Sequence, residues 1–198
     1  SRNFEVKPLF AEPYFQTNIA DAITPAQVRF IKKLPMNVNQ VNKISKEKYL
    51  FERPELASIK TAVDEALANY AREVMGISQS LEVTQSWSLI NPPGVGMHGH
   101  THSNSIISGS LYFTDMPDPP GNMIFERHNY YRQIELLVGE TKRNIYNAPL
   151  NAVVPTKGDI ILFASSIPHF VEENKSQQDR FSIAFNTFVR EAVLLALV

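Results

Sequence analysis

Apolar side chains recur every three or four residues through the first part of the chain, which is the spacing of one helix face. The longest such stripe consists of Leu56, Ile59, Val63, Leu67, Tyr70 and Val74. Its period predicts a helix over Arg53–Met75, which ends before Gly76. A shorter helix is predicted over Ala26–Leu34, because Thr24 can cap its first turn and Pro25 suits that turn.

After the long helix the pattern changes to short apolar runs separated by proline, glycine and asparagine. Eight runs predict strands, at residues 81–90, 104–114, 122–126, 143–146, 152–154, 159–164, 169–173 and 180–189. No helical pattern separates them, so they cannot form parallel strand–helix–strand units. They predict an antiparallel barrel or jelly roll. The helix-first order predicts an α+β fold, in which the N-terminal helices pack on the outer face of one sheet.

The chain has 198 residues, which fits a single domain. We expect residues 1–80 to be a mainly helical part that covers the sheet, and residues 81–190 to be the jelly-roll core. Residues 191–198 would be a C-terminal tail. That tail holds the longest apolar run, Ala192–Val198, which could cover the core or contact a second subunit in a homodimer.

Composition narrows the classes of function. With 19 Lys and Arg against 20 Asp and Glu, the formal net charge of −1 excludes a general nucleic-acid binder. The chain has no Cys, which excludes a disulfide framework, a cysteine-based zinc site and a cysteine nucleophile. No apolar run approaches the roughly 18 residues that span a bilayer, and no signal-peptide pattern is visible. We therefore expect a cytoplasmic protein that does not bind membranes.

Three of the five histidines lie within five residues, in the order His98, His100 and His102. In an extended strand all three project from one face, and two such imidazoles can hold one metal ion. His169, far downstream, can supply a further ligand. The same histidines could instead be structural residues with hydrogen-bond partners. The fifth, His128, stands in a polar stretch and is interpreted as a solvent-exposed loop residue.

The last predicted strand carries a second candidate site. Period two divides it into one face with Arg180, Ser182, Ala184 and Asn186 and another with Phe181, Ile183 and Phe185. The phenylalanine face is expected to pack against a covering helix or a core. An Arg180 on an inner face needs an anionic partner. That partner could be a protein carboxylate such as Glu172 or Asp179, or the carboxylate of a ligand.

Taken in order, these segments resemble the iron(II)/2-oxoglutarate-dependent oxygenase superfamily, and more narrowly a bacterial and phage branch without assigned substrates. The motifs that carry the resemblance are Trp87, His100-Thr-His-Ser-Asn-Ser105, Ser108-Gly-Ser-Leu-Tyr112-Phe, Gly158-Asp-Ile-Ile-Leu-Phe163, Pro168-His-Phe-Val-Glu-Glu-Asn174 and Arg180-x-Ser182. They span residues 81–189, which is over half of the chain.

The resemblance implies a double-stranded β-helix, the jelly-roll form of this superfamily, with iron(II) bound at its open end. His100, His102 and His169 would be the metal ligands. Arg180 and Ser182 would bind the far carboxylate of the cosubstrate 2-oxoglutarate. The implied activity is oxidation of an unactivated C–H bond by iron(II), dioxygen and 2-oxoglutarate. The substrate would be a small molecule or a peptide, and the motifs do not identify it.

Four further residues are candidates for the surroundings of this site. Tyr112 would flank the cosubstrate. His98 could take the place of His102 as a ligand if the register differs. Asn104 could orient a ligand or begin a turn, and Trp87 could be a core anchor or a wall of the open end.

One position departs from the superfamily pattern. The residue two after His100 is usually Asp or Glu, but here it is His102, and no carboxylate occurs between Ile90 and Thr114. Three neutral imidazoles leave the full 2+ charge on the metal, so an anionic cosubstrate becomes the principal charge compensation. Two other functions stay open: a cupin-like three-histidine enzyme that does not use 2-oxoglutarate, and a non-catalytic β-sandwich binding module.

Overall fold

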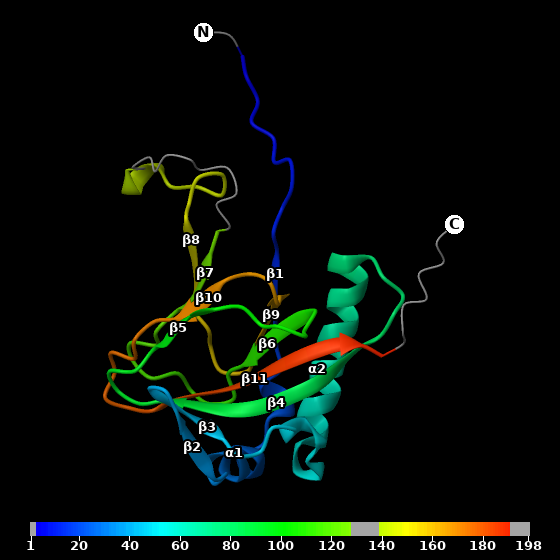
Figure 1. Ribbon diagram of the computed structural model, residues 1–198, viewed down its shortest axis with the longest axis vertical. Helices are drawn as coiled ribbons and strands as arrows, with labels where there is room; N and C mark the ends of the chain where they lie inside the picture. The colour runs from blue at the N-terminus through cyan, green and yellow to red at the C-terminus, as the bar shows by residue number, and fades with distance from the viewer. Residues whose placement is uncertain (1–2, 128–138, 191–198) are drawn as a thin grey trace.

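The computed structural model describes residues 3–127 and 139–190, which form two antiparallel sheets (Figure 1). The larger sheet has seven strands in the order β1-β9-β6-β11-β4-β3-β2, and the smaller has four in the order β5-β10-β7-β8. The bounds are β1 Tyr14–Asn18, β2 Met36–Asn39, β3 Asn42–Ser45, β4 Leu81–Asn91, β5 Met97–His100, β6 Ile107–Leu111, β7 Met123–Glu126, β8 Leu150–Val153, β9 Asp159–Ala164, β10 His169–Val171 and β11 Arg180–Val189.

Both predicted helices are present. The helix α1 (Pro25–Lys32) begins at Thr24, which caps it with both bonds of a capping box. The longer α2 (Ala57–Tyr70) runs beside β11 and β4 of the larger sheet (Figure 1), and a π-helical turn, Ala71–Met75, extends it to Gly76. Short 3-10 turns are η1 Ala20–Ala22, η2 Leu50–Glu52, η3 Pro54–Leu56 and η5 Glu140–Lys142.

Alternate residues of the seven-stranded sheet pack into two separate hydrophobic cores. On β9, Ile160 and Leu162 belong to the core that contains the buried face of α2. The residues between and after them, Ile161 and Phe163, belong to a second core with Phe125 of β7. Because successive side chains of a strand point to opposite faces, one face of this sheet contacts α2 and the other contacts the smaller sheet.

The strand β11 shows the alternation that its sequence predicts. Ile183 and Phe185 lie in the core with α2, and Phe181 packs against that core. Arg180 and Ser182 are buried on the opposite face, which contacts the smaller sheet. The polar side chains of β11 therefore lie in the layer between the two sheets.

The sequence pattern does not indicate three strands that the N-terminal part contributes. The strand β1 pairs with β9 at one edge of the seven-stranded sheet. The strands β2 and β3 form a hairpin at the other edge, with Gln40 in the turn at φ 54°. Residues 1–80, expected to be mainly helical, thus also supply both edges of the larger sheet.

The strand expected at residues 143–146 is absent. A turn begins there instead, in which the side-chain oxygen of Asn144 accepts a hydrogen bond of 2.8 Å from the N–H of Tyr146. An asparagine side chain that bonds the backbone in this way competes with a strand ladder.

The strand β5 ends at His100, so His102 lies in the loop that follows it. The three histidines of residues 98–102 therefore do not share one extended strand.

Some expectations fall on residues that the structure does not describe. These are the exposure of His128 and the role of the C-terminal tail, residues 191–198. Among residues 3–127 and 139–190, no helix combines the length and the apolar character that crossing a membrane would need.

Substitution of Gly109 on β6 is predicted to disturb the core under α2. A methyl group at this position would overlap the ring of Phe185 and lie 2.8 Å from Cδ2 of Leu162. We expect Gly109→Ala to lower the free energy of unfolding by about 1–3 kcal/mol, measured by urea denaturation. Gly139→Ala is the matched control, since no atom of the part of the chain that the structure describes lies within 4 Å of the added methyl group. Equal stability of the two variants would contradict this packing.

Candidate metal centre

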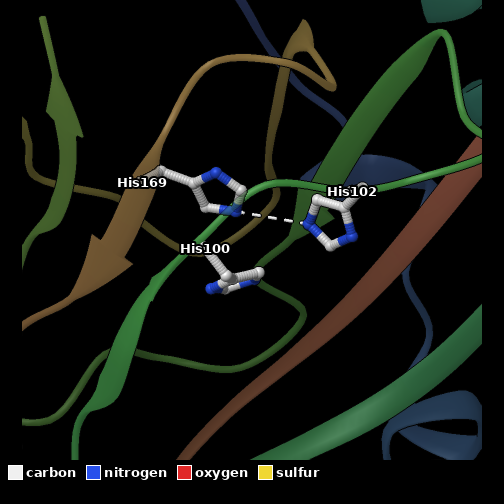
Figure 2. A group of neighbouring side chains, drawn as sticks. All are labelled: His100, His102 and His169. Atoms are coloured by element: carbon white, nitrogen blue, oxygen red, sulfur yellow. Dashed lines mark hydrogen bonds between the residues drawn. The ribbon is translucent and has the colours of Figure 1, made fainter. Parts of the chain in front are cut away.

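Two strands of the smaller sheet bring distant histidines together. In the antiparallel pairing of β5 with β10, His100 stands directly opposite His169. His102 follows two residues after β5, and its Nε2 lies 3.3 Å from Nε2 of His169. Each of the three residues offers one nitrogen, and these nitrogens all lie within 4.8 Å of one another. Figure 2 shows the three imidazoles converging on one space from two segments of the chain.

Backbone carbonyls fix the tautomers of two of these imidazoles. Nδ1 of His100 is 2.8 Å from the carbonyl oxygen of His98, and Nδ1 of His169 is 2.9 Å from that of Ile167. A carbonyl oxygen can only accept a hydrogen bond, so the proton of each neutral ring is on Nδ1. Each Nε2 then carries a free lone pair, which is the state that a metal ligand requires.

Burial keeps His102 and His169 uncharged near neutral pH. Desolvation, followed by the neighbouring His100, lowers the pKa of His102 to about 4. Desolvation is also the main cause that lowers the pKa of His169 to about 4. The ring of Phe163 contacts that of His169, with 4.5 Å between the centroids, and contributes to its burial. Both imidazoles are therefore neutral at pH 7 and can bind a metal ion without first losing a proton.

The other candidates from the sequence lie around this group. His98 is exposed and does not belong to the three-histidine cluster, although its ring centroid is 5.5 Å from that of His100. Asn104 is exposed and has a φ of 56°, as turn residues do. Trp87 is half-buried opposite Ala184 of β11, on the face that contacts the smaller sheet.

Arg180 is a buried cation in the same layer. Only 2% of its surface is exposed, and its Nε and Nη1 have no hydrogen-bond partner among the described residues. Neither Glu172 nor Asp179 forms an ion pair with it within residues 3–127 and 139–190; the Glu172 carboxylate instead accepts a hydrogen bond of 2.9 Å from the N–H of Asn122. A buried guanidinium left in this state favours an anionic ligand.

Four residues of the sequence lie near this guanidinium or on its face of the sheet. A methyl group added to Gly121, whose φ is 68°, would lie 3.0 Å from Nη1, so the backbone there comes close to the cation. Burial lowers the pKa of Arg180, and the nearby Tyr112 and Glu172 oppose that shift. Tyr112 is itself buried, which raises the pKa of its hydroxyl. Ser182, two residues along β11, is buried on the same face as Arg180.

The donor set fits the two groups that the resemblance implies. Imidazole nitrogens are common ligands of iron, and three imidazoles, each of which offers one nitrogen, are gathered here. An unpartnered guanidinium is suited to a carboxylate, which it can bind through two parallel hydrogen bonds. Iron(II) and the far carboxylate of 2-oxoglutarate therefore match separate, complementary parts of the layer between the sheets.

A family model described as "Putative 2OG-Fe(II) oxygenase", where 2OG is 2-oxoglutarate, matches residues 85–186. This segment is just over half of the chain and contains the three histidines and Arg180. The chain belongs to the 2OG-Fe(II) oxygenase family. It is accordingly an oxygenase-family enzyme, whose cofactors are iron(II) and 2-oxoglutarate. Comparison with the curated proteins finds no match.

Solved structures of other proteins have a similar fold. An oxidoreductase of the 2OG-Fe(II) oxygenase family from Burkholderia pseudomallei is 12% identical, with a TM-score of 0.61 over 88% of this chain and 83% of its own. A Pseudomonas putida prolyl-4-hydroxylase is 14% identical, with a TM-score of 0.60 over 91% and 94%. HygX from Streptomyces hygroscopicus, solved with nickel, 2-oxoglutarate and hygromycin B, is 13% identical, with a TM-score of 0.60 over 89% and 82%. These likenesses support the antiparallel, sheet-rich fold.

One feature near the histidines is not indicated by the sequence. The N–H of His102 donates to the carbonyl oxygen of Ser165, at 3.0 Å, and the Ser165 hydroxyl donates to Oγ of Ser105, at 2.8 Å. The chain has many serines, and no spacing distinguishes Ser165 from the others. Its importance follows from the position that β9 gives it.

The lowered pKa values predict an acid-sensitive stability of the metal-free oxygenase. Unfolded histidines have a pKa near 6.5, whereas His102 and His169 are near 4 in the fold. Between these values the unfolded chain binds more protons, so the free energy of unfolding should fall as the pH is lowered from about 6.5 to about 4. Urea denaturation at pH 7.5 and pH 5, with a chelator present, measures this loss.

The double variant His102→Gln, His169→Gln provides the control for that experiment. Its glutamines do not titrate, so it should lose less stability over the same pH interval than the wild type. A parallel decline in both proteins would show that these two histidines are not held neutral by the fold.

Proposed function

We propose that this oxygenase binds iron(II) through His100, His102 and His169 and binds the far carboxylate of 2-oxoglutarate through Arg180 and Ser182. The observation that carries this assignment is the buried guanidinium of Arg180, whose Nε and Nη1 have no hydrogen-bond partner among the described residues, in the layer that also holds the three converging imidazoles. Without an anionic ligand, that guanidinium would be a costly buried charge.

An electrostatic contact supports one shared ligand. Glu172 acts electrostatically on Arg180 and comes three residues after His169, so the guanidinium lies near the segment that carries His169. Tyr112, buried near Arg180, would flank the same ligand.

When bound, iron(II) and 2-oxoglutarate supply the oxidation: one oxygen atom of dioxygen enters the substrate, the other enters succinate, and carbon dioxide is released. The residues of the chain bind and orient. The Nε2 lone pairs of His100 and His169, set by their carbonyl partners, would face the metal. Phe163 contacts His169 and Phe125 and would exclude water from the inner side of the site.

The third imidazole changes the charge of the site. With His102 in place of a carboxylate, the metal would keep its full 2+ charge until the dianionic 2-oxoglutarate binds. We infer that electrostatic attraction for the cosubstrate is stronger here than at a site with two histidines and one carboxylate. The substrate, a small molecule or a peptide, would then meet a site whose charge the cosubstrate has neutralised.

We also propose the finer architecture. The two antiparallel sheets would be the two halves of a double-stranded β-helix, with α1 and α2 on the outer face of the larger one. Residues 1–198 would form one domain, with the jelly-roll core in 81–190. The shared core of α2 and the seven-stranded sheet supports this assignment. The cytoplasmic location, the homodimer and the supporting roles of His98, Asn104 and Trp87 stay predictions from the sequence.

Anaerobic titration tests the assignment of metal and cosubstrate. Iron(II) and 2-oxoglutarate added to the metal-free protein should give a weak visible charge-transfer band. In Arg180→Ala the dissociation constant of 2-oxoglutarate should rise about a hundredfold, or about 2.7 kcal/mol, because the charged hydrogen bonds are lost. The affinity for iron(II) alone should be unchanged, since Arg180 is not a metal ligand.

Arg53→Ala is the matched control, because Arg53 is an exposed arginine that pairs with Glu55. It should leave the band and both affinities unchanged. If wild-type protein binds neither iron(II) nor 2-oxoglutarate, the proposed function is wrong. If Arg180→Ala binds 2-oxoglutarate normally, the carboxylate assignment alone is wrong.

Restoring the usual carboxylate should weaken binding of the cosubstrate. His102→Asp lowers the charge of the metal site by one unit, which weakens its electrostatic attraction for the dianionic 2-oxoglutarate. We expect the dissociation constant of 2-oxoglutarate to rise roughly tenfold, or about 1.4 kcal/mol, within the ~1 to ~4 kcal/mol span for one charge at 4 Å. Calorimetry on the manganese(II)-loaded proteins measures it. Tighter binding by His102→Asp would contradict the charge argument.

A further inference from the structure

The three histidines are not positioned in the same way. His100 and His169 stand opposite each other on paired strands, so the sheet itself fixes them. His102 lies in the loop between β5 and β6, where Asn104 makes a turn with a φ of 56°. No strand ladder reaches His102, and its position depends on what holds the loop.

A group of hydroxyls holds this loop to the larger sheet. Ser165, at the end of β9, accepts the N–H of His102 with its carbonyl oxygen, at 3.0 Å. Its hydroxyl donates to Oγ of Ser105, at 2.8 Å. Ser105 donates in turn to the carbonyl oxygen of Ile107, at 3.0 Å, and accepts the N–H of Thr187 of β11, at 3.2 Å. The loop is thereby tied to two strands, one on each side of β6.

The same group continues into the layer between the sheets. Oγ of Ser108 lies 2.8 Å from Oγ of Ser165 and 3.0 Å from Oδ1 of Asn186. Thr187 adds a second bond from its hydroxyl to the carbonyl oxygen of Ile107, at 2.8 Å. A shift in the β11–β4 register falls between Asn186 and Thr187, and such bulges re-aim side chains.

The burial of these hydroxyls indicates what the network contributes to the fold. Ser165, Ser108 and Thr187 are buried, and each has hydrogen-bond partners. A buried hydroxyl contributes little net stability and costs about 1–3 kcal/mol if its partner is lost. A fully satisfied buried network therefore specifies one geometry more than it adds stability. The geometry specified here is that of the segment from His102 to Ser105.

We propose that Ser165 and Ser105 are positioning residues for His102, the ligand that stands where a carboxylate is usual. Ser165 holds the backbone of His102 directly, and its hydroxyl link to Ser105 holds the far side of the turn. This inference rests on the proposed function, because it assumes that His102 binds the metal. It adds that the third ligand is set by a hydroxyl network rather than by strand pairing.

Cobalt(II) binding to the metal-free protein tests the proposal without any turnover. Ser105→Ala and Ser165→Ala each remove a hydroxyl that ties the segment from His102 to Ser105 to the larger sheet, while the bond from the His102 N–H to the Ser165 backbone carbonyl stays. Each should raise the dissociation constant of cobalt(II) about 10- to 100-fold, as is typical when supports of a ligand are removed. The visible d–d spectrum of the bound ion should change, because one imidazole is no longer fixed. Ser105→Thr keeps the hydroxyl at a half-buried position and should restore both values.

Ser45→Ala is the matched control. Ser45 is a buried serine on β3 that donates to the carbonyl oxygen of Glu47 and accepts the N–H of Ser88, away from the histidines. Its loss should lower stability yet leave cobalt(II) affinity and spectrum unchanged. Wild-type affinity in both Ser105→Ala and Ser165→Ala would overturn the positioning role. Failure of the wild type to bind cobalt(II) would instead remove the proposed metal site, so the two failures are distinguishable.

Discussion

The fold and the candidate site both depend on the alternation of side chains between the two faces of the seven-stranded sheet. Successive side chains of β6, β9 and β11 cannot share a face, so each strand contributes equally to an apolar core and to the layer between the sheets. The core with α2 supplies the burial that stabilises the fold. Polar residues can therefore lie on the other face without entering that core, and Arg180 and Ser182 do so.

The layer between the sheets contains polar groups that bound ligands would satisfy. Burial keeps His102 and His169 neutral, while the guanidinium of Arg180 is charged and lacks partners for two of its nitrogens. The protein thus provides neutral donors at one place and a cation at another, with no carboxylate in the three-histidine group. A divalent metal ion would add two positive charges to that of Arg180, and a dianion would offset two of these three. The charges of this layer would therefore be closest to balanced when the metal ion and the dianion bind together.

The sequence predicts those parts of the fold in which a pattern of side chains repeats over several residues. The apolar face of α2 and the alternation of polar and apolar residues on β11 each involve many side chains. A single exceptional residue therefore does not obscure either pattern. The strands β1, β2 and β3, which lie at or next to the edges of the larger sheet, lack such a pattern, because exposed edges tolerate polar residues on either face. A single side chain can also override a short run, as Asn144 does in the turn at 143–146. The position of His102 depends on Ser165, and no local pattern links residues so far apart in the chain.

The three histidines come from two segments, since His102 and His169 are 67 residues apart. The unfolded chain keeps only the histidines of residues 98–102 as neighbours, so the complete ligand set exists in the folded state alone. A bound metal ion would act as a non-covalent crosslink between the β5 end and β10, and its binding free energy would add to that of folding. Metal supply would then govern the survival of the protein as well as its chemistry, because chains without metal would unfold and be degraded more often.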